Sequence, residues 1–478
     1  MKPRLICAFI CFCNLAFAFA GEIRVYPAPA GEKLSDDYTV TVAGQNAPVY
    51  VAKVAPAEPS LRWKAMDDKA NSANYFQTAA FASFDLQGKV TITIACREDV
   101  RSAKILPSPL KIEPGIRDHT IQFTLSEPKT LTIELNGQWT NALHLFANPF
   151  ETKVPAPGDP HVIYFGPGIH EVTHVVVTNN QTVYLAGGAI VRGVIGTNEP
   201  FSISGYSGLR NYSPTFELQG TNIAFRGRGI LDGGLCPTHA RNLLFIHGND
   251  IRVEGVIFRD SSTWTIPVRR SERVTIQNVK LLGHRANSDG IDVCNSRDVT
   301  VENSFIRTLD DLIVVKTDKG QGEARHIIAR NCVLWNEVAH ALSIGAELRE
   351  NVDDVLFENC DVIHDKGREW TLRIYHCDSA RVSNVRFENL RIEESPRLIS
   401  LWIGKAVWTR DSERGQIDSV IFKNITAQSN PLTIALTGFD ENHAVETVTF
   451  QNVIANGQPI SPEQVKMNEF VRNVRVVP

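Results

Sequence analysis

Residues 274–306 read VTIQNVKLLGHRANSDGIDVCNSRDVTVENSFI and contain one pattern twice. In VTIQNVK (274–280) and VTVENSF (299–305), apolar residues occupy alternate positions and are followed by an asparagine and a further apolar residue. The pattern recurs downstream in HIIARNCV, VLFENCDV, VRFENLRI, VIFKNITA and VTFQNVIA. The asparagines are 25, 28, 28, 30, 35 and 28 residues apart, at Asn278, Asn303, Asn331, Asn359, Asn389, Asn424 and Asn452. A repeat of this length is typical of a solenoid, in which each unit forms one turn of the stack.

The unit has the period of a β-strand and no helical stripe, so we expect an all-β chain whose solenoid is a right-handed parallel β-helix. A leucine-rich horseshoe is the rival repeat fold, but its LxxLxL spacing does not occur. The inward Val, Ile and Phe side chains should stack from coil to coil. Each recurring asparagine should occupy a turn, where its side chain tolerates the left-handed conformation and can bond the asparagines above and below.

Residues 21–156 read differently, as short alternating strands such as TVTVAG, APVYVAKV and KVTITIAC separated by turn residues. This spacing predicts an N-terminal β-sandwich domain. We find no catalytic constellation there and expect an accessory domain or one that forms a wall of the site. The Pro/Gly-rich stretch VPAPGDP (154–160) is the natural boundary, so the β-helix catalytic domain should occupy residues 157–478.

Residues 1–20 carry the features of a secretory signal peptide. Lys2 and Arg4 precede an apolar run over residues 5–19, and Ala18-Phe19-Ala20 is a cleavage-type sequence. A membrane anchor is the alternative interpretation, but the run is short for a spanning helix. We therefore expect a secreted or periplasmic protein with no membrane partner.

Composition excludes several other classes of protein. The chain has 478 residues, is 43% hydrophobic and carries a net charge of −4, which argues against disorder and against a nucleic-acid partner. Six cysteines follow residue 20 without a CxxC pair, so a zinc site is not expected. Cys332 and Cys360 occupy equivalent repeat positions and should fill the core, while one disulfide bridge remains open.

Polar residues recur at the interval of the repeat. Asp310 lies 21 residues after Asp289, His340 lies 30 after Asp310, and Arg373 lies 33 after His340. Residues one coil apart become neighbours at one strand spacing, about 4.8 Å, so these side chains and Asp311 should gather on one outer face. Asp310 and Asp311 would point to opposite sides of a regular strand, so both face a cleft only at a bend or a strand end.

Clustered carboxylates beside a cation suit glycoside hydrolysis. That reaction needs a protonated acid at the leaving oxygen and an ionised carboxylate that activates water or attacks carbon. Crowding of like charges keeps one carboxyl protonated, and a neighbouring cation keeps another ionised. The spacing alone is compatible with either stereochemical outcome.

At these residues the sequence resembles glycoside hydrolase family 28, the polygalacturonase family. The motifs of that family, NTD, DD, GHG and RIK, correspond in order to NSD (287–289), DD (310–311), AHA (339–341) and RIY (373–375). The similarity covers about residues 160–460 and includes GRGILDGG, SSTWTIPV and TLDDLIVVK. The N-terminal strands resemble the sandwich that precedes the β-helix in family 49 dextranases.

The resemblance implies inverting hydrolysis without a metal or other cofactor. It implies that Asp310 is the general acid, that Asp289 and Asp311 position and deprotonate water, and that His340 tunes the acid or binds substrate beside it. Arg373 matches a substrate-binding cation. Asn287 and Asp292 are plausible supports for these residues.

Two departures from the family pattern bear on specificity. Ala339 and Ala341 replace the glycines of GHG, which is a small steric change, and Tyr375 replaces the lysine of RIK. That lysine helps to bind a uronate carboxylate, a role that needs a charge and that a phenol cannot fill. Lys316, Arg368 or Lys405 could compensate, or Tyr375 could stack on a neutral sugar. Three tryptophans could line the cleft: Trp264, Trp370 and Trp402.

We therefore expect a hydrolase of a polysaccharide or its oligosaccharides, pectin-like or related. The alternatives are a β-helix polysaccharide lyase, which commonly needs Ca²⁺, and a non-catalytic carbohydrate-binding protein. The solenoid with its extra domain is predicted to be a monomer. Endo or exo action stays open.

Overall fold

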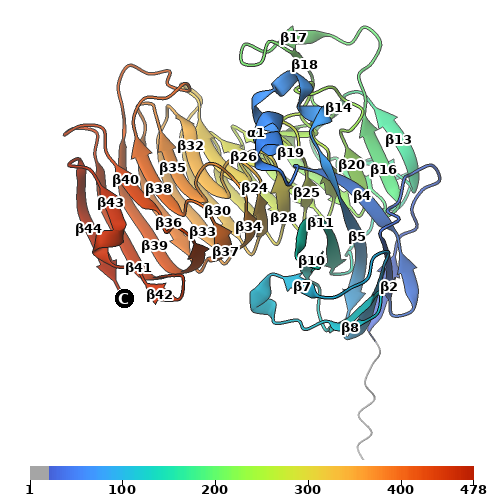
Figure 1. Ribbon diagram of the computed structural model, residues 1–478. Coiled ribbons are helices and arrows are strands. Elements are labelled where there is room, and N and C mark those ends of the chain that lie inside the picture. The colour runs from blue at the N-terminus through green and yellow to red at the C-terminus, as the bar shows by residue number, and fades with distance from the viewer. Residues whose placement is uncertain (1–20) are drawn as a thin grey trace, which may run out of the picture.

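The computed structural model describes residues 21–478, so the predicted signal peptide (residues 1–20) lies outside the described residues. Figure 1 shows a long stack of parallel strands with a smaller β-structure packed beside its N-terminal half. Within residues 21–478, no helix combines the length and apolar character needed to span a membrane.

Two sheets form the smaller structure and share one hydrophobic core. The first has the order β1-β5-β11-β10-β7 with β4 beside β5, and the second has the order β3-β2-β6-β9-β8. Val40, Phe84, Ile92 and Leu145 are among the side chains buried between the sheets. The predicted β-sandwich is therefore present. Its strands are β1 (Glu22–Val25), β2 (Tyr38–Val42), β3 (Gln45–Ala47), β4 (Val49–Val54), β5 (Gln77–Gln87), β6 (Val90–Cys96), β7 (Ala103–Leu106), β8 (Gly115–Arg117), β9 (Thr120–Leu125), β10 (Thr130–Leu135) and β11 (Gln138–Asn148).

A helical segment interrupts the sandwich between β4 and β5. It consists of α1 (Pro59–Asp67) and the 3-10 helix η1 (Lys69–Asn74). The sequence analysis did not predict it, because only Arg62 and Ala65 of α1 are buried and no apolar stripe marks the helix. Two further 3-10 turns are η2 (Ser108–Leu110) and η3 (Pro462–Gln464).

The large part of the chain is a parallel β-helix, as predicted. Each coil contributes strands to three parallel stacks. The first stack carries the asparagine repeat and comprises β12 (Val162–Phe165), β15 (Thr182–Leu185), β19 (Phe216–Gly227), β21 (Leu244–Glu254), β24 (Glu272–Gln277), β27 (Arg297–Glu302), β30 (Ala324–Arg330), β33 (Val352–Glu358), β36 (Arg381–Glu388), β39 (Gln416–Ser429), β41 (Val445–Ala455) and β44 (Val471–Val477).

The second stack follows the asparagine turns and faces the sandwich. It comprises β13 (Gly168–Val172), β16 (Ala189–Gly193), β20 (Ile230–Asp232), β22 (Ile257–Arg259), β25 (Lys280–Leu282), β28 (Phe305–Thr308), β31 (Val333–Asn336), β34 (Asp361–Asp365) and β37 (Arg391–Ser395).

The third stack carries the polar motifs. It contains β14 (Val175–Val177), the first halves of β19 and β21, β23 (Ile266–Arg269), β26 (Ile291–Cys294), β29 (Ile313–Thr317), β32 (Leu342–Leu348), β35 (Leu372–His376), β38 (Ile399–Ile403), β40 (Ile434–Thr437) and β43 (Val465–Met467). Two short pairs lie outside the stacks: the hairpin of β17 (Phe201–Ile203) and β18 (Arg210–Tyr212), and β42 (Gln458–Pro459) against β41.

The repeated asparagines form the predicted turns. All seven have a positive φ, between 50° and 56°. Six of the side chains bond from coil to coil in two sets of three: Asn359 donates to Asn331 at 2.8 Å and Asn331 to Asn303 at 3.3 Å, while Asn452 donates to Asn424 and Asn424 to Asn389. A short polar side chain is among the few that adopt this conformation at low cost. Both parts of the asparagine prediction are therefore confirmed.

One continuous core runs along the inside of the β-helix. It contains stacked phenylalanines such as Phe387 and Phe422, whose ring centroids are 4.9 Å apart, and it includes Cys332 and Cys360. All six cysteines of the described chain are buried free thiols. The disulfide bridge that the sequence analysis left as a possibility is therefore not formed among them.

The sandwich packs on the second stack through aromatic side chains. Phe81 and Phe146 of the sandwich share a buried cluster with Phe305 and Trp335 of the β-helix. Charged groups add fixed contacts: Arg228 and Asp85 form a fully buried ion pair at 2.7 Å. The last strand of the sandwich ends at Asn148, and the first strand of the solenoid begins at Val162. The predicted domain boundary, between residues 156 and 157, falls in the segment that joins them and stays a prediction.

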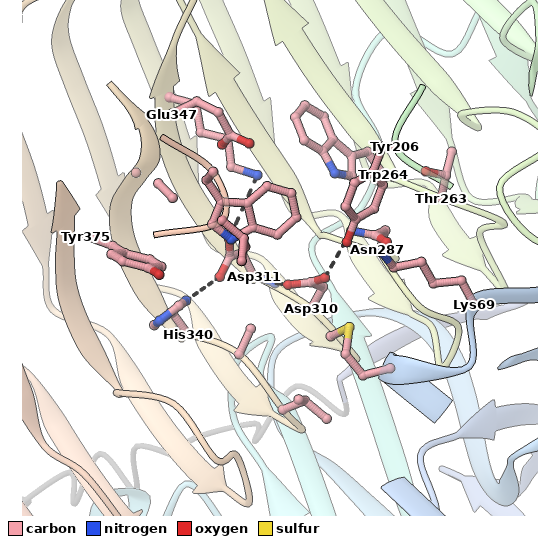
Figure 2. A pocket seen from close by; sticks show the side chains of 18 of the residues that line it. Lys69, Tyr206, Thr263, Trp264, Asn287, Asp310, Asp311, His340, Glu347 and Tyr375 are labelled. Carbon is pink, nitrogen blue, oxygen red and sulfur yellow. Dashed lines mark hydrogen bonds and ion pairs between the residues drawn. The ribbon is translucent and has the colours of Figure 1, made fainter. Parts of the chain in front are cut away.

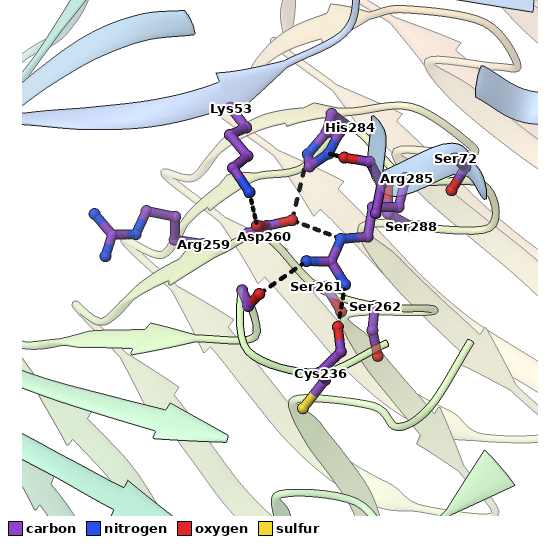
Figure 3. A network of polar contacts seen from close by, with 12 residues as sticks. Lys53, Ser72, Cys236, Arg259, Asp260, Ser261, Ser262, His284, Arg285 and Ser288 are labelled. Atoms are coloured by element: carbon purple, nitrogen blue, oxygen red, sulfur yellow. Dashed lines mark hydrogen bonds and ion pairs between the residues drawn. The ribbon is translucent and has the colours of Figure 1, made fainter. Parts of the chain in front are cut away.

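A polar network beside the third stack holds the sandwich close to the predicted site (Figure 3). Asp260 forms ion pairs with the ammonium of Lys53 at 3.5 Å and with the guanidinium of Arg285 at 2.9 Å, and it lies 3.3 Å from His284. The Ser72 hydroxyl of η1 accepts the backbone N–H of Ala286 at 3.0 Å. The turn that carries the NSD motif is thereby fixed from the sandwich side.

Candidate active site

Strand register brings the polar motifs together on the third stack. Ile266 pairs with Ile291, Ile291 pairs with Ile313, and Ile313 pairs with Leu342. The residues two positions before these four partners therefore follow one another in a column: Trp264, Asp289, Asp311 and His340. Arg373 enters from the next strand, where it pairs with Ser343. This is the gathering that the repeat spacing predicted.

Asp310 and Asp311 lie in a bend between β28 and β29, which lets both carboxylates face the same cleft. The Asp310 carboxylate accepts the backbone N–H of Asp311 at 3.0 Å and the side-chain amide of Asn287 at 3.4 Å. Burial, with the neighbouring charge of Asp311, raises the pKa of Asp310 to about 7. Asp310 therefore keeps its proton at a pH at which an ordinary carboxyl is ionised.

A chain of hydrogen bonds extends from Asp311, and Figure 2 shows its first bond, between Asp311 and His340. His340 Nδ1 lies 2.5 Å from Asp311, Arg373 donates to His340 Nε2 at 3.0 Å, and Arg373 also donates to Glu369 at 2.7 Å. A guanidinium can only donate, so Nε2 accepts and Nδ1 carries the proton towards Asp311. Burial acts to raise the pKa of Asp311, but His340 with its hydrogen bond and the positive charges of Lys316 and Arg373 lower the pKa below the ordinary value.

The positive charge of Lys316 offsets the negative charge of the remaining carboxylates. Its ammonium lies 3.0 Å from Asp289, 2.8 Å from Asp292 and 3.8 Å from Asp311, and 4.0 Å from the ring centroid of Trp264. Burial acts to lower the pKa of Lys316, yet these carboxylates raise it well above its usual value, so the amine is charged. Burial also raises the pKa of both Asp289 and Asp292, against the pull of Lys316. Asp289 and Asp292 therefore release their protons at higher pH than isolated carboxyls would.

The carboxylate spacing suits one bridging water. Asp289, Asp310 and Asp311 each offer an oxygen within 4.8 Å of the others, and the buried Asp289 Oδ1 makes no hydrogen bond within residues 21–478. A water that donates to two oxygens at about 2.8 Å each spans about 4.5–5 Å. Three oxygens at this spacing could also surround a cation, but the Lys316 ammonium already supplies positive charge to the cluster.

The cluster lies in a cleft of about 840 Å³. Tyr375 and Trp264 line it on either side of the carboxylates. The Tyr375 ring meets Trp402 edge-on, with centroids 5.2 Å apart, and the Arg373 guanidinium lies 3.8 Å from the Tyr375 centroid. Aromatic faces next to hydrogen-bonding side chains are the usual lining of a site for a sugar-sized ligand.

All ten predicted site residues are brought together, but in different settings. The lining includes Trp264, Asn287, Asp310, Asp311, Lys316, His340, Arg373 and Tyr375, while Asp289 and Asp292 lie buried just behind it. Among the other candidates, Arg368 reaches the lining but pairs with Asp67 at 2.6 Å. Trp402 lies behind Tyr375, and neither Trp370 nor Lys405 belongs to the lining.

Sequence reasoning missed the other walls of the cleft. They are formed by Lys69 of η1, by Tyr206 between β17 and β18, by Glu347 near the end of β32, and by Trp408 in the loop between β38 and β39. None of these belongs to the repeat pattern. Lys69, Tyr206 and Trp408 also lie far from the four motifs along the chain, so no sequence signal pointed to them.

Comparison with known proteins agrees with this geometry. The family model described as Glycosyl hydrolases family 28 matches residues 219–473. The chain is 30% identical over 177 residues to an endo-polygalacturonase of Pectobacterium carotovorum subsp. carotovorum, covering 35% of this chain and 40% of that protein. It is 23% identical over 358 residues to an isopullulanase of Aspergillus niger, covering 62% and 59%. The chain thus spans about half the length of these curated relatives.

Two solved structures share the fold. Dex49A from Penicillium minioluteum, a family 49 dextranase, aligns with 95% of this chain and 96% of its own at 15% identity and a TM-score of 0.54. The exopolygalacturonase from Thermotoga maritima aligns with 66% of this chain and 84% of its own at 18% identity and a TM-score of 0.51. The first alignment includes the sandwich as well as the β-helix.

Proposed function

Because the chain belongs to glycosyl hydrolases family 28, we propose that it cleaves glycosidic bonds in a polysaccharide, pectin-like or related, or in its oligosaccharides. It is a polygalacturonase-like hydrolase of O-glycosyl bonds. The observation that carries the proposal is the cluster of carboxylates in the cleft, where burial and the charge of Asp311 raise the pKa of Asp310 to about 7 while His340 lowers the pKa of Asp311.

These residues support an acid/base mechanism. Asp310 faces the cleft and holds the proton that the leaving oxygen needs. Asp311 and Asp289 stand where they can bind one water between them, and the ionised Asp311 can accept its proton as the water attacks the sugar carbon. His340 and Arg373 hold Asp311 in its ionised form and in place.

Direct attack by a bridging water inverts the anomeric configuration. We therefore propose an inverting reaction without a metal, in which Lys316 supplies the positive charge behind the carboxylates. Proton NMR of the first product distinguishes this from a covalent route, because the inverted anomer must appear before mutarotation. Retention of configuration would contradict the bridging-water role of Asp289 and Asp311.

Charge near Arg373 bears on the sugar that is bound. Glu369 already neutralises Arg373 at 2.7 Å, and Tyr375 brings no charge. Glu347 adds a further carboxylate to the lining. A neutral sugar ring over Tyr375 is thus favoured over a uronate at this position, and a uronate would have to lie towards Lys69 or Arg410 on the other walls.

A screen of defined polysaccharides tests the proposal. We expect new reducing ends from at least one of homogalacturonan, rhamnogalacturonan, dextran and arabinan, with no ultraviolet-absorbing unsaturated product and no loss of rate in EDTA. Unsaturated product and chelator sensitivity would instead establish a Ca²⁺-dependent lyase. Binding of a polysaccharide without cleavage would establish the carbohydrate-binding alternative.

The pattern of residues 1–20 supports export, so we place the enzyme outside the cytoplasm, in the medium or the periplasm. N-terminal sequencing of protein from the culture medium and from the periplasm tests this. A mature chain that begins at Gly21 is expected, and an uncleaved chain in the cytoplasm would contradict it.

A further inference from the structure

The cleft above the carboxylates is bridged by side chains from three distant segments. Tyr206, at the tip of the β17–β18 hairpin, meets Trp408 of the loop between β38 and β39, with ring centroids 5.1 Å apart. The ammonium of Lys69, from η1 of the sandwich, lies 3.4 Å from the centroid of the same Tyr206 ring. We call Lys69, Tyr206 and Trp408 the roof.

The roof belongs to the same cavity as the catalytic cluster. All three side chains line the cavity that Asp310, Asp311 and His340 also line. Figure 2 shows Lys69 and Tyr206 on the Asn287 side of the carboxylates. Tyr206 is 45% exposed and Val407, next to Trp408, is 82% exposed, so both loops rise from the core into solvent.

Both loops are anchored at their bases. The backbone N–H groups of Arg410 and Asp411 donate to Asp378 at 2.6 and 2.8 Å, and Asp411 pairs with Arg349 at 2.8 Å. A loop fixed in this way holds Trp408 in one place.

The hairpin is fixed in a similar way. Tyr212 N–H donates to Ala240 at 2.7 Å, the Asn211 amide donates to the His239 carbonyl at 3.2 Å, and the Tyr206 ring stacks on His239 with centroids 6.2 Å apart. Both loops of the roof are thus held in place by contacts with the β-helix.

A bridged cleft restricts how a polymer reaches Asp310. An internal segment of a polysaccharide enters a groove only sideways, and the contact between Tyr206 and Trp408 blocks that route. A chain end can instead be inserted beneath the roof. A cavity of about 840 Å³ is within the range that encloses a ligand of a few rings, about 300–1,000 Å³.

We propose that the enzyme attacks chain ends and releases short products, with the roof as the structural cause. This rests on the proposed glycoside hydrolase function and deepens it, because it specifies which bonds of the polymer are cleaved. It also gives the sandwich a role in catalysis, since η1 supplies Lys69 to the roof.

The test uses the polysaccharide from the screen that the full-length enzyme cleaves fastest. Product size by chromatography and solution viscosity are followed from the earliest times. The wild type is expected to release one short product from the start while viscosity falls slowly. The double variant Tyr206→Ala, Trp408→Ala is expected to form intermediate oligomers early and to lower viscosity several-fold more per bond cleaved.

Phe439→Ala is the matched control, because Phe439 is an exposed aromatic residue outside the cleft lining and should keep the wild-type product pattern. A ladder of intermediate oligomers from the wild type would overturn the inference while leaving the hydrolase function intact. A double variant that melts like the wild type yet still releases only the short product would overturn the role of the roof. Absence of cleavage of every polysaccharide counts against the proposed function itself.

Discussion

At the residue scale, two adjacent aspartates are given opposite protonation states. Asp310 lacks a cationic hydrogen-bond partner within the described chain and is surrounded by buried carboxylates, so its pKa rises to about 7. Asp311, one residue later, is held by His340, and its pKa is lowered. An acid and a base are thereby obtained from the same residue type, one position apart.

This difference predicts the pH profile of hydrolysis. The acid must be protonated, so activity should be lost as pH rises through about 7. Asp311 must be ionised, so activity should also fall at low pH, on the acid limb of the profile. Because the pKa of Asp311 is lowered, this limb should lie below the ordinary aspartate pKa of about 3.9. His340→Gln removes the imidazole whose short hydrogen bond lowers the pKa of Asp311, so the acid limb should move to higher pH while the alkaline limb stays. Profiles of kcat/KM for both proteins measure this, and an unmoved acid limb in His340→Gln would contradict the assignment of Asp311.

The site residues that could be predicted are those tied to the repeat. Asp289, Asp311 and His340 precede strands whose spacing follows the asparagine pattern, so sequence distance translates directly into position in the column. Lys69 and Tyr206 could not be placed in this way. Their positions depend on how η1 and the β17–β18 hairpin pack on other segments, and no period in the sequence records that packing.

At the element scale, the asparagine turns hold one coil to the next. Asn331 has a φ of 56°, accepts from Asn359 and donates to Asn303. The repeat made this element predictable, because the same residue recurs at every coil. Helix α1 was not predictable, because it has no repeat and no apolar stripe.

Two substitutions separate the contribution of the left-handed backbone conformation from that of the side-chain hydrogen bonds. Asn331→Ala places a β-carbon in a left-handed turn and removes both ladder bonds, and should cost about 2–4 kcal/mol of unfolding free energy. Asn331→Gly removes the bonds but tolerates the conformation, and should cost about 1–3 kcal/mol. Denaturant unfolding measures both. An alanine variant as stable as the glycine variant would show that the backbone conformation contributes nothing.

At the scale of the whole molecule, the sandwich and the β-helix are joined by a buried histidine. His364 of β34 lies 2.5 Å from Glu134 of β10 and 2.7 Å from Glu394 of β37. Burial acts to lower the pKa of His364, but the hydrogen bonds to the two carboxylates raise it above its ordinary value. When it is protonated, the histidine donates to both carboxylates and bridges the two parts of the chain.

The raised pKa of His364 stabilises the folded protein at pH values below the pKa of histidine in the unfolded chain, about 6.5. This stabilisation is lost as the pH rises through the pKa that His364 has in the folded protein. His364→Gln should lower the melting temperature more at pH 6 than at pH 9, by the equivalent of about 1–3 kcal/mol at the lower pH. His326→Gln is the control, because His326 is 46% exposed and its pairs should contribute little. Equal loss at both pH values would contradict a charged bridge at His364.

The central claim is that Asp310 donates the proton that breaks the glycosidic bond. The most direct test compares wild type with Asp310→Asn on the polysaccharide that the wild type cleaves, with reducing ends and thermal melting measured on the same preparations. The account predicts a rate lower by about 10²- to 10⁴-fold with an unchanged melting curve. A variant that folds normally and retains most of the wild-type rate would contradict it.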